Sequence, residues 1–362
     1  MTPSVALVHD YLTQRGGAER TVLAMLRAFP AAPLYTSVYL PSATFPEFAS
    51  ADLRTLPLNR IGLFRRHHRL ALPFYAPAFS ALQVKADVAL CSTSGWAHGV
   101  RTTGHKIVYC HVPARWLYEP DQYLGARRGA RRVALAAMRP LLVRWDRRAA
   151  RRADRFLTVS TVVRERIRAE YGIDATVLPP PLTVDTQGRR EAMEVEPGFL
   201  LAPSRLVPLK NVAAIIEAFR SHPDERLVIA GAGPERRRLE TNAPPNVFFA
   251  GEANDSQMRW LYANCEAIVV ASLEGFGLTA LEANAFGKPA LVPRGGGFLD
   301  TIVEGESGLF FDKPEPHAIA GAVDEFRSIT WSAELVARNA ARFDEQSFVR
   351  GLRQVVGDVL AE

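Results

Sequence analysis

Three consecutive prolines, residues 179–181, divide this chain of 362 residues into two stretches that each alternate short apolar segments with helical patterns. Three prolines can continue neither a helix nor a central strand, so they form a stiff extended connector. Strands separated by helices indicate parallel sheets that are covered on both faces. We therefore predict an α/β protein of two doubly wound domains, residues 1–182 and 183–344.

The apolar periodicity gives the expected elements. In the first domain we expect helices at 18–29 and about 127–152, and strands at 5–8, 34–39, 88–91, 107–110, 156–159 and 176–178. In the second we expect strands at 199–202, 226–230, 247–250, 267–271 and 290–292, and helices at 211–220, 235–241, 255–264, 278–286 and from 314 onward. Such domains bind ligands at the carboxyl ends of their strands, and a cleft between two of them is the default site.

Composition excludes several classes of protein. Hydrophobic residues make up 48% and charged residues 23%, which argues against disorder. No apolar run is long enough for a membrane span, and His9 and Asp10 interrupt the opening apolar stretch, so no secretory signal is expected. Three isolated cysteines argue against disulfides and structural zinc, and favour a reducing cytoplasm.

The charge is unevenly distributed. Residues 1–185 hold 26 lysines and arginines against 13 acidic residues, whereas residues 186–362 hold 18 against 25. Residues 60–82 mix basic and aromatic side chains, and residues 127–168 hold 14 arginines against three acids. A solvated helix face and nucleic-acid binding are alternatives, but no nucleic-acid motif accompanies the charge. We expect peripheral contact with an anionic membrane and no nucleic acid.

Two segments place cations or glycines just after a strand. Gly16 and Gly17 follow the first strand and open a helix, where free N–H groups favour an anion; the alternative is an ordinary turn. Arg205 and Lys210 lie in the turn that follows residues 199–202. Two cations beside a helix start can hold a diphosphate and neutralise it as it leaves; the alternative is a surface turn with solvated charges.

The segment from Glu274 to Glu282 has the most specific pattern. Gly275 and Gly277 follow a strand and precede a helix, so their neighbourhood offers backbone N–H groups to phosphate. Glu274 lies in the loop within reach of sugar hydroxyls, and Glu282, about one helical turn in, can accept from two ribose hydroxyls. Acids that suit a helix dipole are the alternative explanation.

Three further residues are weaker candidates. His111 ends a strand on the expected cleft side, although a single histidine is often structural. Glu252 and Asp255 follow the strand at 247–250, where a carboxylate can accept from the two-donor edge of guanine. Asp255 can equally cap the helix at 255–264.

Taken together, these residues resemble those of the retaining GT-B glycosyltransferases of family 4, whose domains are Rossmann-like. Glu274 and Glu282 match that family's paired-glutamate motif, and Arg205 with Lys210 its basic pair. Further matches are Gly16-Gly17, the turn 231–234 that contains Gly233, and the segments 295–299 and 305–308. The pieces 9–19 and 110–113 are most like bacterial O-antigen and exopolysaccharide mannosyltransferases that use GDP-mannose. Ser204 stands where a glycine is common.

The resemblance implies transfer of a sugar, with retained configuration, from a nucleoside diphosphate to a glycan or lipid-linked acceptor. It assigns His111, Arg205, Lys210 and Glu274 to catalysis, with the diphosphate itself accepting the acceptor's proton. It assigns donor binding to Gly16, Gly17, Gly233, Glu252, Gly275, Phe276, Gly277, Leu278 and Glu282. It also implies that a C-terminal helix, about residues 345–362, crosses back to the first domain.

We expect no cofactor and no metal, because the chain holds no Asp-X-Asp sequence and cationic side chains must neutralise the phosphates. The expected location is the cytoplasm, at the inner face of a bacterial plasma membrane. The alternatives are a UDP-sugar-dependent transferase of the same fold, a nucleotide-sugar 2-epimerase, and a noncatalytic nucleotide-sugar sensor or assembly partner.

Overall fold

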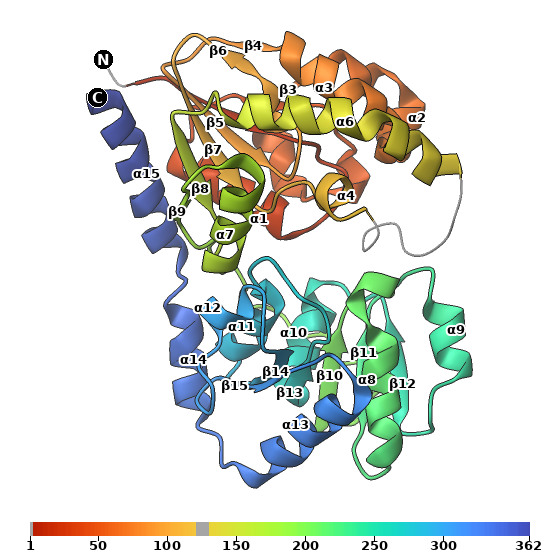
Figure 1. Cartoon of the computed structure of the whole chain (residues 1–362). Helices are drawn as coiled ribbons and strands as arrows, with labels where there is room; N and C mark the ends of the chain where they lie inside the picture. The colour runs from red at the N-terminus through yellow and green to blue at the C-terminus, as the bar shows by residue number, and fades with distance from the viewer. Residues whose placement is uncertain (1–2, 121–129) are drawn as a thin grey trace. The chain divides into compact units, whose positions relative to one another are not determined.

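The computed structural model describes residues 3–120 and 130–362, and divides into two compact units. The N-terminal unit comprises Met1–Pro181 together with Glu345–Glu362, and the C-terminal unit comprises Leu182–Asp344. The chain therefore changes unit at the third proline and again at the start of the last helix. Figure 1 shows both units with their helices and strands labelled. Each is described below on its own.

The N-terminal unit is built on a seven-stranded parallel sheet with the strand order β3-β2-β1-β5-β7-β8-β9. Its strands are β1 (Val5–His9), β2 (Leu34–Thr36), β3 (Leu53–Thr55), β5 (Val88–Thr93), β7 (His105–Cys110), β8 (Arg155–Thr158) and β9 (Thr176–Val177). A two-stranded sheet pairs β4 (Gln83–Val84) with β6 (Arg101–Thr102). The three central strands β1, β5 and β7 are fully buried or nearly so, as expected of a parallel sheet covered on both faces.

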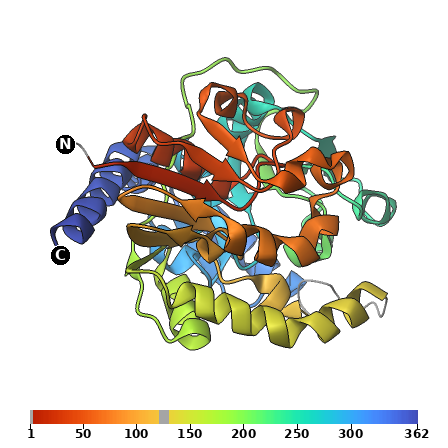
Figure 2. The ribbon, with the colours of Figure 1, turned by 90° about the horizontal axis from the view of Figure 1, so that it is seen from above.

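Seven α-helices of this unit lie in the described residues: α1 (Gly17–Ala28), α2 (Gly62–Arg66), α3 (Leu72–Ala81), α4 (Arg115–Tyr118), α6 (Ala130–Ala150), α7 (Thr161–Tyr171) and α15 (Glu345–Ala361). The long helix α6 (yellow to green) and the last helix α15 (dark blue) can be followed in Figure 2. Local sequence sets their ends. Ser160 caps α7 by accepting from the Val163 N–H at 3.2 Å, and Gly172 ends the helix with a φ of 71°.

The last helix packs against the N-terminal unit. Helix α15 lies against α1, and Phe348 on α15 packs edge-on to Tyr109 of β7 with their ring centroids 5.8 Å apart. Glu345 pairs with Arg27 of α1 at the start of α15, and Glu362 pairs with Arg155 at its end. These contacts fix the helix as an integral element of this unit.

The C-terminal unit holds a six-stranded parallel sheet of order β12-β11-β10-β13-β14-β15. Its strands are β10 (Phe199–Pro203), β11 (Leu227–Ala230), β12 (Val247–Gly251), β13 (Cys265–Val269), β14 (Ala290–Pro293) and β15 (Gly308–Phe311). Its helices are α8 (Val212–Ala218), α9 (Arg236–Thr241), α10 (Asp255–Asn264), α11 (Leu278–Ala285), α12 (Phe298–Thr301), α13 (Pro316–Ser328) and α14 (Ala333–Ala341). The strand order reverses between β10 and β13, where doubly wound sheets bind ligands.

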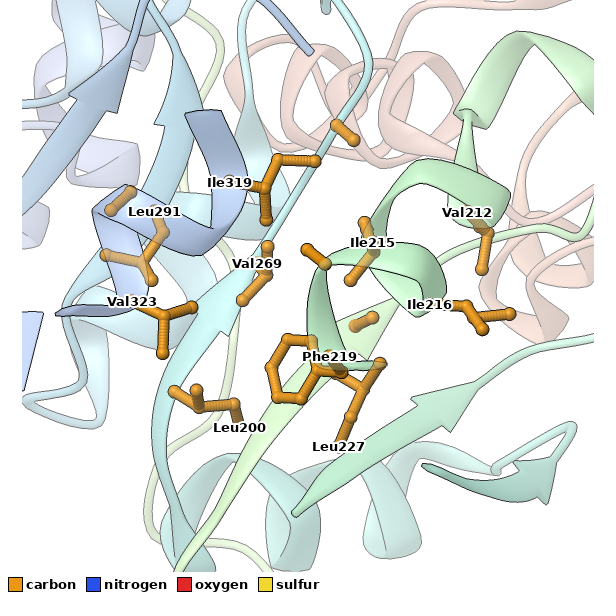
Figure 3. Packing of buried hydrophobic residues seen from close by; sticks show 14 of the residues in the cluster. Leu200, Val212, Ile215, Ile216, Phe219, Leu227, Val269, Leu291, Ile319 and Val323 are labelled. Atoms are coloured by element: carbon orange, nitrogen blue, oxygen red, sulfur yellow. The ribbon is translucent and has the colours of Figure 1, made fainter. Parts of the chain in front are cut away.

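Alternation along the strands builds two cores, one on each face of this sheet. Leu200 and Val269 face one way and pack with Phe219 and with Ile319 of α13 (Figure 3). Their neighbours Leu201 and Ile268 face the other way and join a second buried cluster with helices α10 and α11. Successive side chains of a strand point to opposite faces, so a continuous apolar run is what a doubly covered strand requires.

The sequence-based prediction of two doubly wound domains is confirmed, although several bounds differ. The segment 34–39 is a strand only to Thr36, and the helix expected at 211–220 begins at Val212 because Asn211 adopts a left-handed φ of 51°. The long basic helix begins at Ala130 in the described residues; residues 127–129 lie outside them. Strands β3, β4, β6 and β15 were not predicted.

Candidate functional site

Two predicted site residues of the C-terminal unit form an ion pair. The Nζ of Lys210 lies 2.5 Å from the Glu274 Oε1, and the Ser272 hydroxyl donates to the same oxygen at 2.5 Å. Lys210 comes from the loop after β10 and Glu274 from the loop after β13, the two adjacent strands at which the sheet order reverses. Both side chains are largely buried, with 19% and 26% of their surface exposed. A cationic and an anionic side chain thus lie together at the position where doubly wound sheets bind ligands.

The backbone around Lys210 is tightly constrained. Lys210 ends a short 3₁₀ helix, Pro208–Lys210, and the next residue, Asn211, holds its left-handed φ while its side-chain amide donates to the Pro314 carbonyl at 2.7 Å. Asparagine tolerates this conformation better than most residues, and its bond to Pro314 fixes it here. The loop therefore holds Lys210 in one place.

The glycines near Glu274 allow two loops to pack backbone against backbone. A Cβ on Gly297 would lie 2.3 Å from the Phe276 Cα, and one on Gly296 would lie 2.5 Å from the Glu274 carbonyl oxygen. The Gly297 N–H also donates to that carbonyl at 2.9 Å. Gly277 has a φ of 98°, and its Cβ would strike the Phe298 ring. These glycines position the loop at 272–278.

A second pair of glycines does the same for the loop that carries Arg205. Gly231 has a φ of 147°, and a Cβ there would lie 2.0 Å from the Ser204 carbonyl oxygen. A Cβ on Gly233 would lie 2.2 Å from the Leu206 carbonyl oxygen. Gly233 thus holds the turn after β11 directly against the segment between Arg205 and Lys210.

The start of helix α11 offers backbone donors. Gly277 occupies the cap position without a side-chain cap, and Leu278 is the first helical residue. The Phe276 ring is buried edge-on against Phe343 at 5.4 Å, so only the backbone of Phe276 is available to a ligand. Uncapped N–H groups at a helix start, next to the Lys210 ammonium, favour an anion.

Glu282 lies farther along α11 and is held by a partner that the sequence analysis missed. The Tyr262 hydroxyl on α10 donates to the Glu282 Oε2 at 2.9 Å, and the Tyr262 ring stacks on Phe286 at 5.6 Å. The sequence does not indicate that Tyr262 bonds Glu282, because the contact between α10 and α11 arises only when the chain folds.

Arg205 and Glu252 are exposed, and neither joins the pair formed by Lys210 and Glu274. The Arg205 carbonyl accepts from the Val207 N–H and the Ser204 hydroxyl, whereas its guanidinium has no hydrogen bond or ion pair with any residue that the structure describes. The predicted capping role of Asp255 is wrong: Asn254 caps α10, accepting from the Gln257 N–H at 2.9 Å, while the Gln257 side chain bonds back to Asn254. Within residues 3–120 and 130–362, no three His, Cys, Asp or Glu side chains gather into a possible metal site.

The N-terminal unit places its candidate residues at the carboxyl edge of its own sheet. His9 of β1 pairs in register with Ser92 of β5, and Ser92 with Tyr109 of β7, two residues before His111. The Ser92 hydroxyl oxygen lies 2.8 Å from the His111 Nε2 and 3.0 Å from the His9 Nδ1. Gly16 and Gly17 follow β1 at the same edge, where Gly17 opens α1.

His111 is neutral at physiological pH. Burial, and secondarily the charge of His9, lowers its pKa to about 3. Asp10 organises the adjoining loop: its carboxylate accepts from the Ser94, Trp96 and Ala97 N–H groups at 2.7, 3.1 and 2.6 Å. Hydrogen bonds thus fix the side chains and the loop at the edge of the sheet that holds His111.

Both units match known protein families. Residues 184–343 match the family model of the glycosyl transferases group 1, and residues 15–186 match that of Glycosyltransferase Family 4. No helix in the part of the chain that the structure describes has the length and apolar character needed to cross a bilayer.

Relatives by sequence are glycosyltransferases. The chain is 27% identical over 206 residues to an uncharacterized glycosyltransferase, YqgM, of Bacillus subtilis, covering 54% of this chain and 57% of that protein. It is 32% identical to a D-inositol 3-phosphate glycosyltransferase of Acidothermus cellulolyticus, covering 55% and 49%. The chain thus spans about half the length of these two relatives. With a GDP-mannose-dependent alpha-mannosyltransferase of Mycolicibacterium smegmatis the identity is 28%, covering 86% and 80%.

Solved structures match over almost the whole chain. A sucrose-phosphate synthase from Thermosynechococcus elongatus matches with a TM-score of 0.71 and 18% identity, over 99% of both chains. Anabaena HepE, solved in complex with UDP-glucose, matches with a TM-score of 0.70 and 16% identity, over 98% of this chain and 99% of that one. The two Rossmann-like units thus make up the GT-B fold.

Proposed function

We propose that the chain is a retaining glycosyltransferase that moves a sugar from a nucleoside diphosphate to a glycan or lipid-linked acceptor without a metal ion. The observation that carries the proposal is the ion pair between Lys210 and Glu274 beside the uncapped start of α11. Matches of both units to glycosyltransferase families support it. The sensor and epimerase alternatives are less favoured, because no feature of the described residues points to either.

In this proposal, a bound diphosphate displaces Glu274 from Lys210. Lys210 and Arg205 then neutralise the phosphates, and the N–H groups of residues 276–278 hold the β-phosphate. Glu274 is released to bind the sugar hydroxyls, and Glu282 holds the ribose. In the empty protein, Lys210 and Glu274 compensate each other's charge, and the ligand replaces that pairing when it binds.

The chemical step exchanges one bond for another on the same face of the sugar. The bond from C1 to the β-phosphate oxygen breaks, and a bond from C1 to the acceptor oxygen forms. The proton of the acceptor hydroxyl passes to a phosphate oxygen of the leaving diphosphate, so no side chain serves as nucleophile. His111, being neutral, hydrogen-bonds the sugar and does not act as an acid.

GDP-mannose is the proposed donor, supported by the relative from Mycolicibacterium smegmatis that spans most of this chain. A thermal-shift panel of GDP, UDP, ADP and dTDP in EDTA tests base and metal together, because selective binding raises the melting temperature by mass action. We expect GDP to give the largest shift and EDTA to leave it intact. A largest shift with UDP would make the chain a UDP-sugar enzyme, and shifts seen only with added Mn²⁺ would contradict metal independence.

We also propose that the N-terminal unit touches an anionic membrane. Residues 53–86 hold no Asp or Glu, and helices α2 and α3 expose Leu63 and Phe74, 56% and 49% accessible, among exposed arginines. Helix α6 exposes Leu141, 74% accessible, and continues into the exposed Arg144, Arg148, Arg151 and Arg152. Trp145 of α6 donates to Ser80 of α3 at 2.8 Å, so these two helices are in contact. Arg127 and Arg128 lie outside the described residues.

Flotation with vesicles tests this contact. We expect binding to phosphatidylglycerol vesicles but not to phosphatidylcholine vesicles, and Leu63→Ser is expected to weaken it about tenfold, since a buried leucine contributes roughly 1.5–3 kcal/mol. The matched control is Leu335→Ser, which replaces a similarly exposed leucine on α14 of the other unit. Equal recovery on neutral vesicles, or equal loss in both variants, would contradict the proposal.

A further inference from the structure

A buried chain of polar side chains leads from the interior of the N-terminal unit to His111. Glu19, in the first turn of α1, is 1% exposed, and its Oε1 lies 3.9 Å from the Nε2 of His9, itself 3% exposed. The Ser92 hydroxyl lies between His9 and His111, 3.0 Å from the His9 Nδ1 and 2.8 Å from the His111 Nε2. Sequence analysis singled out His111 alone, and the proposed chemistry uses none of the other three.

A carbonyl group sets the direction of these hydrogen bonds. The His9 Nδ1 also lies 3.2 Å from the Ser92 carbonyl oxygen, which can only accept. Nδ1 of His9 therefore carries a proton and donates to both oxygens of Ser92. The Ser92 hydroxyl proton is then free to point the other way, toward the His111 Nε2.

Glu19 lies on the other side of the His9 ring. Its Oε1 faces the His9 Nε2, and its Oε2 is buried without a hydrogen-bond partner among the described residues. His9 thus has the Glu19 carboxylate on its Nε2 side and Ser92 on its Nδ1 side.

We infer that His9 and Ser92 are positioning residues that hold His111 as the neutral tautomer with its proton on Nδ1. Nε2 of His111 accepts from Ser92, so Nδ1 must carry the one remaining proton. Nδ1 has no hydrogen-bond partner among the described residues, and His111 is only half-buried. His111 thus presents a fixed donor to a ligand, as suits a sugar hydroxyl oxygen. The use of that donor on a sugar rests on the proposed function, whereas the tautomer does not.

Nitrogen NMR of the full chain labelled with ¹⁵N-histidine reads the tautomer without any substrate. The chain has eight histidines, and the His111→Gln variant identifies the signals of His111. At pH 7 we expect a protonated Nδ1 and a bare Nε2 for His111, and a protonated Nδ1 for His9. A wild-type His111 protonated on Nε2 would overturn the inference.

Variants separate positioning from packing. In Ser92→Ala, Nε2 loses its donor, and we expect His111 to shift toward the Nε2–H form that free histidine favours. Ser37→Ala is the matched control, because it removes another fully buried hydroxyl of the same unit, one that bonds the Asp10 carbonyl. An unchanged His111 spectrum in Ser92→Ala, or the same change in Ser37→Ala, would refute the role of Ser92.

Binding of GDP-mannose and GDP distinguishes this inference from the proposed function. We expect Ser92→Ala to weaken binding of GDP-mannose about tenfold, because one hydrogen bond to the sugar is lost, and to leave GDP binding unchanged. The wild-type spectra can show the expected tautomer while Ser92→Ala binds both ligands as the wild type does. In that case the sugar contact of His111 in the proposed function is wrong, and the tautomer assignment stands. If the spectra fail, the positioning role is wrong whatever the affinities.

Discussion

Replacement of Lys210 by alanine is expected to lower donor turnover about 10²–10³-fold, the usual effect of removing one preorganised group that stabilises transition-state charge. The reason is local: Lys210 is the ammonium held beside Glu274 and the start of α11, in a loop constrained by Asn211. Without Lys210, the negative charge of the leaving diphosphate is less well compensated. In the empty site, Glu274 loses the cation with which it pairs. Slow release of GDP from GDP-mannose in the absence of acceptor is the assay.

Lys313→Ala is the control for this variant, because Lys313 is an exposed lysine of the same unit. It is expected to turn over donor at the wild-type rate. Arg205→Ala is expected to fall between the two, since Arg205 is exposed and makes no contact with Glu274 in the described residues. Wild-type turnover in Lys210→Ala would remove Lys210 from the mechanism.

The second large effect is expected from Gly297→Ala. The added methyl would lie 2.3 Å from the Phe276 Cα and 2.5 Å from the Gly275 carbonyl oxygen, and backbone atoms cannot step aside as a side chain can. Overpacking of this kind costs about 1–3 kcal/mol. The loop at 272–278 must shift, so we expect GDP affinity to fall together with stability. Urea unfolding and calorimetric titration with GDP measure the two effects.

Gly321→Ala provides the matching control within the same unit. Gly321 lies in the middle of α13, and an added Cβ would meet nothing within 4 Å. This variant is expected to gain about 0.5–1 kcal/mol, the usual difference between alanine and glycine inside a helix, with unchanged GDP affinity. Equal stability and affinity in Gly297→Ala and wild type would show that the two loops do not depend on their backbone contact.

The sequence predicted the large elements because a parallel sheet covered on both faces produces long apolar runs separated by helical periods. It predicted α10 at its observed bounds, and β10 and β14 to within one residue. It missed β3, β4, β6 and β15. Strand β3 is three residues long and mostly exposed, and β4 and β6 have two residues each, so these three lack the apolar run that marks a central strand. Strand β15 opens on Gly308 and has only three apolar residues, and so short a run does not by itself indicate a strand.

For the site, sequence pattern found the charged residues but not what holds them. Lys210 and Glu274 were predicted in the loops that the structure brings together. Sequence pattern could not identify Tyr262 or Ser92, because each acts through a partner that is distant in sequence. Tyr262 bonds Glu282, and Ser92 lies between two histidines. Gly275 and Gly277 were predicted to bind the donor, and that stays a prediction, whereas the backbone packing that Gly296 and Gly297 allow was not foreseen.

The central claim is that the loops after β10 and β13 bind a diphosphate, and calorimetric titration of GMP against GDP tests it most directly. In the wild type we expect GDP to bind at least tenfold more tightly than GMP, because charge-assisted hydrogen bonds contribute about 1.5–3 kcal/mol each. In Lys210→Ala that preference should largely disappear while GMP affinity stays the same. Equal affinities of the wild type for GMP and GDP would contradict the account.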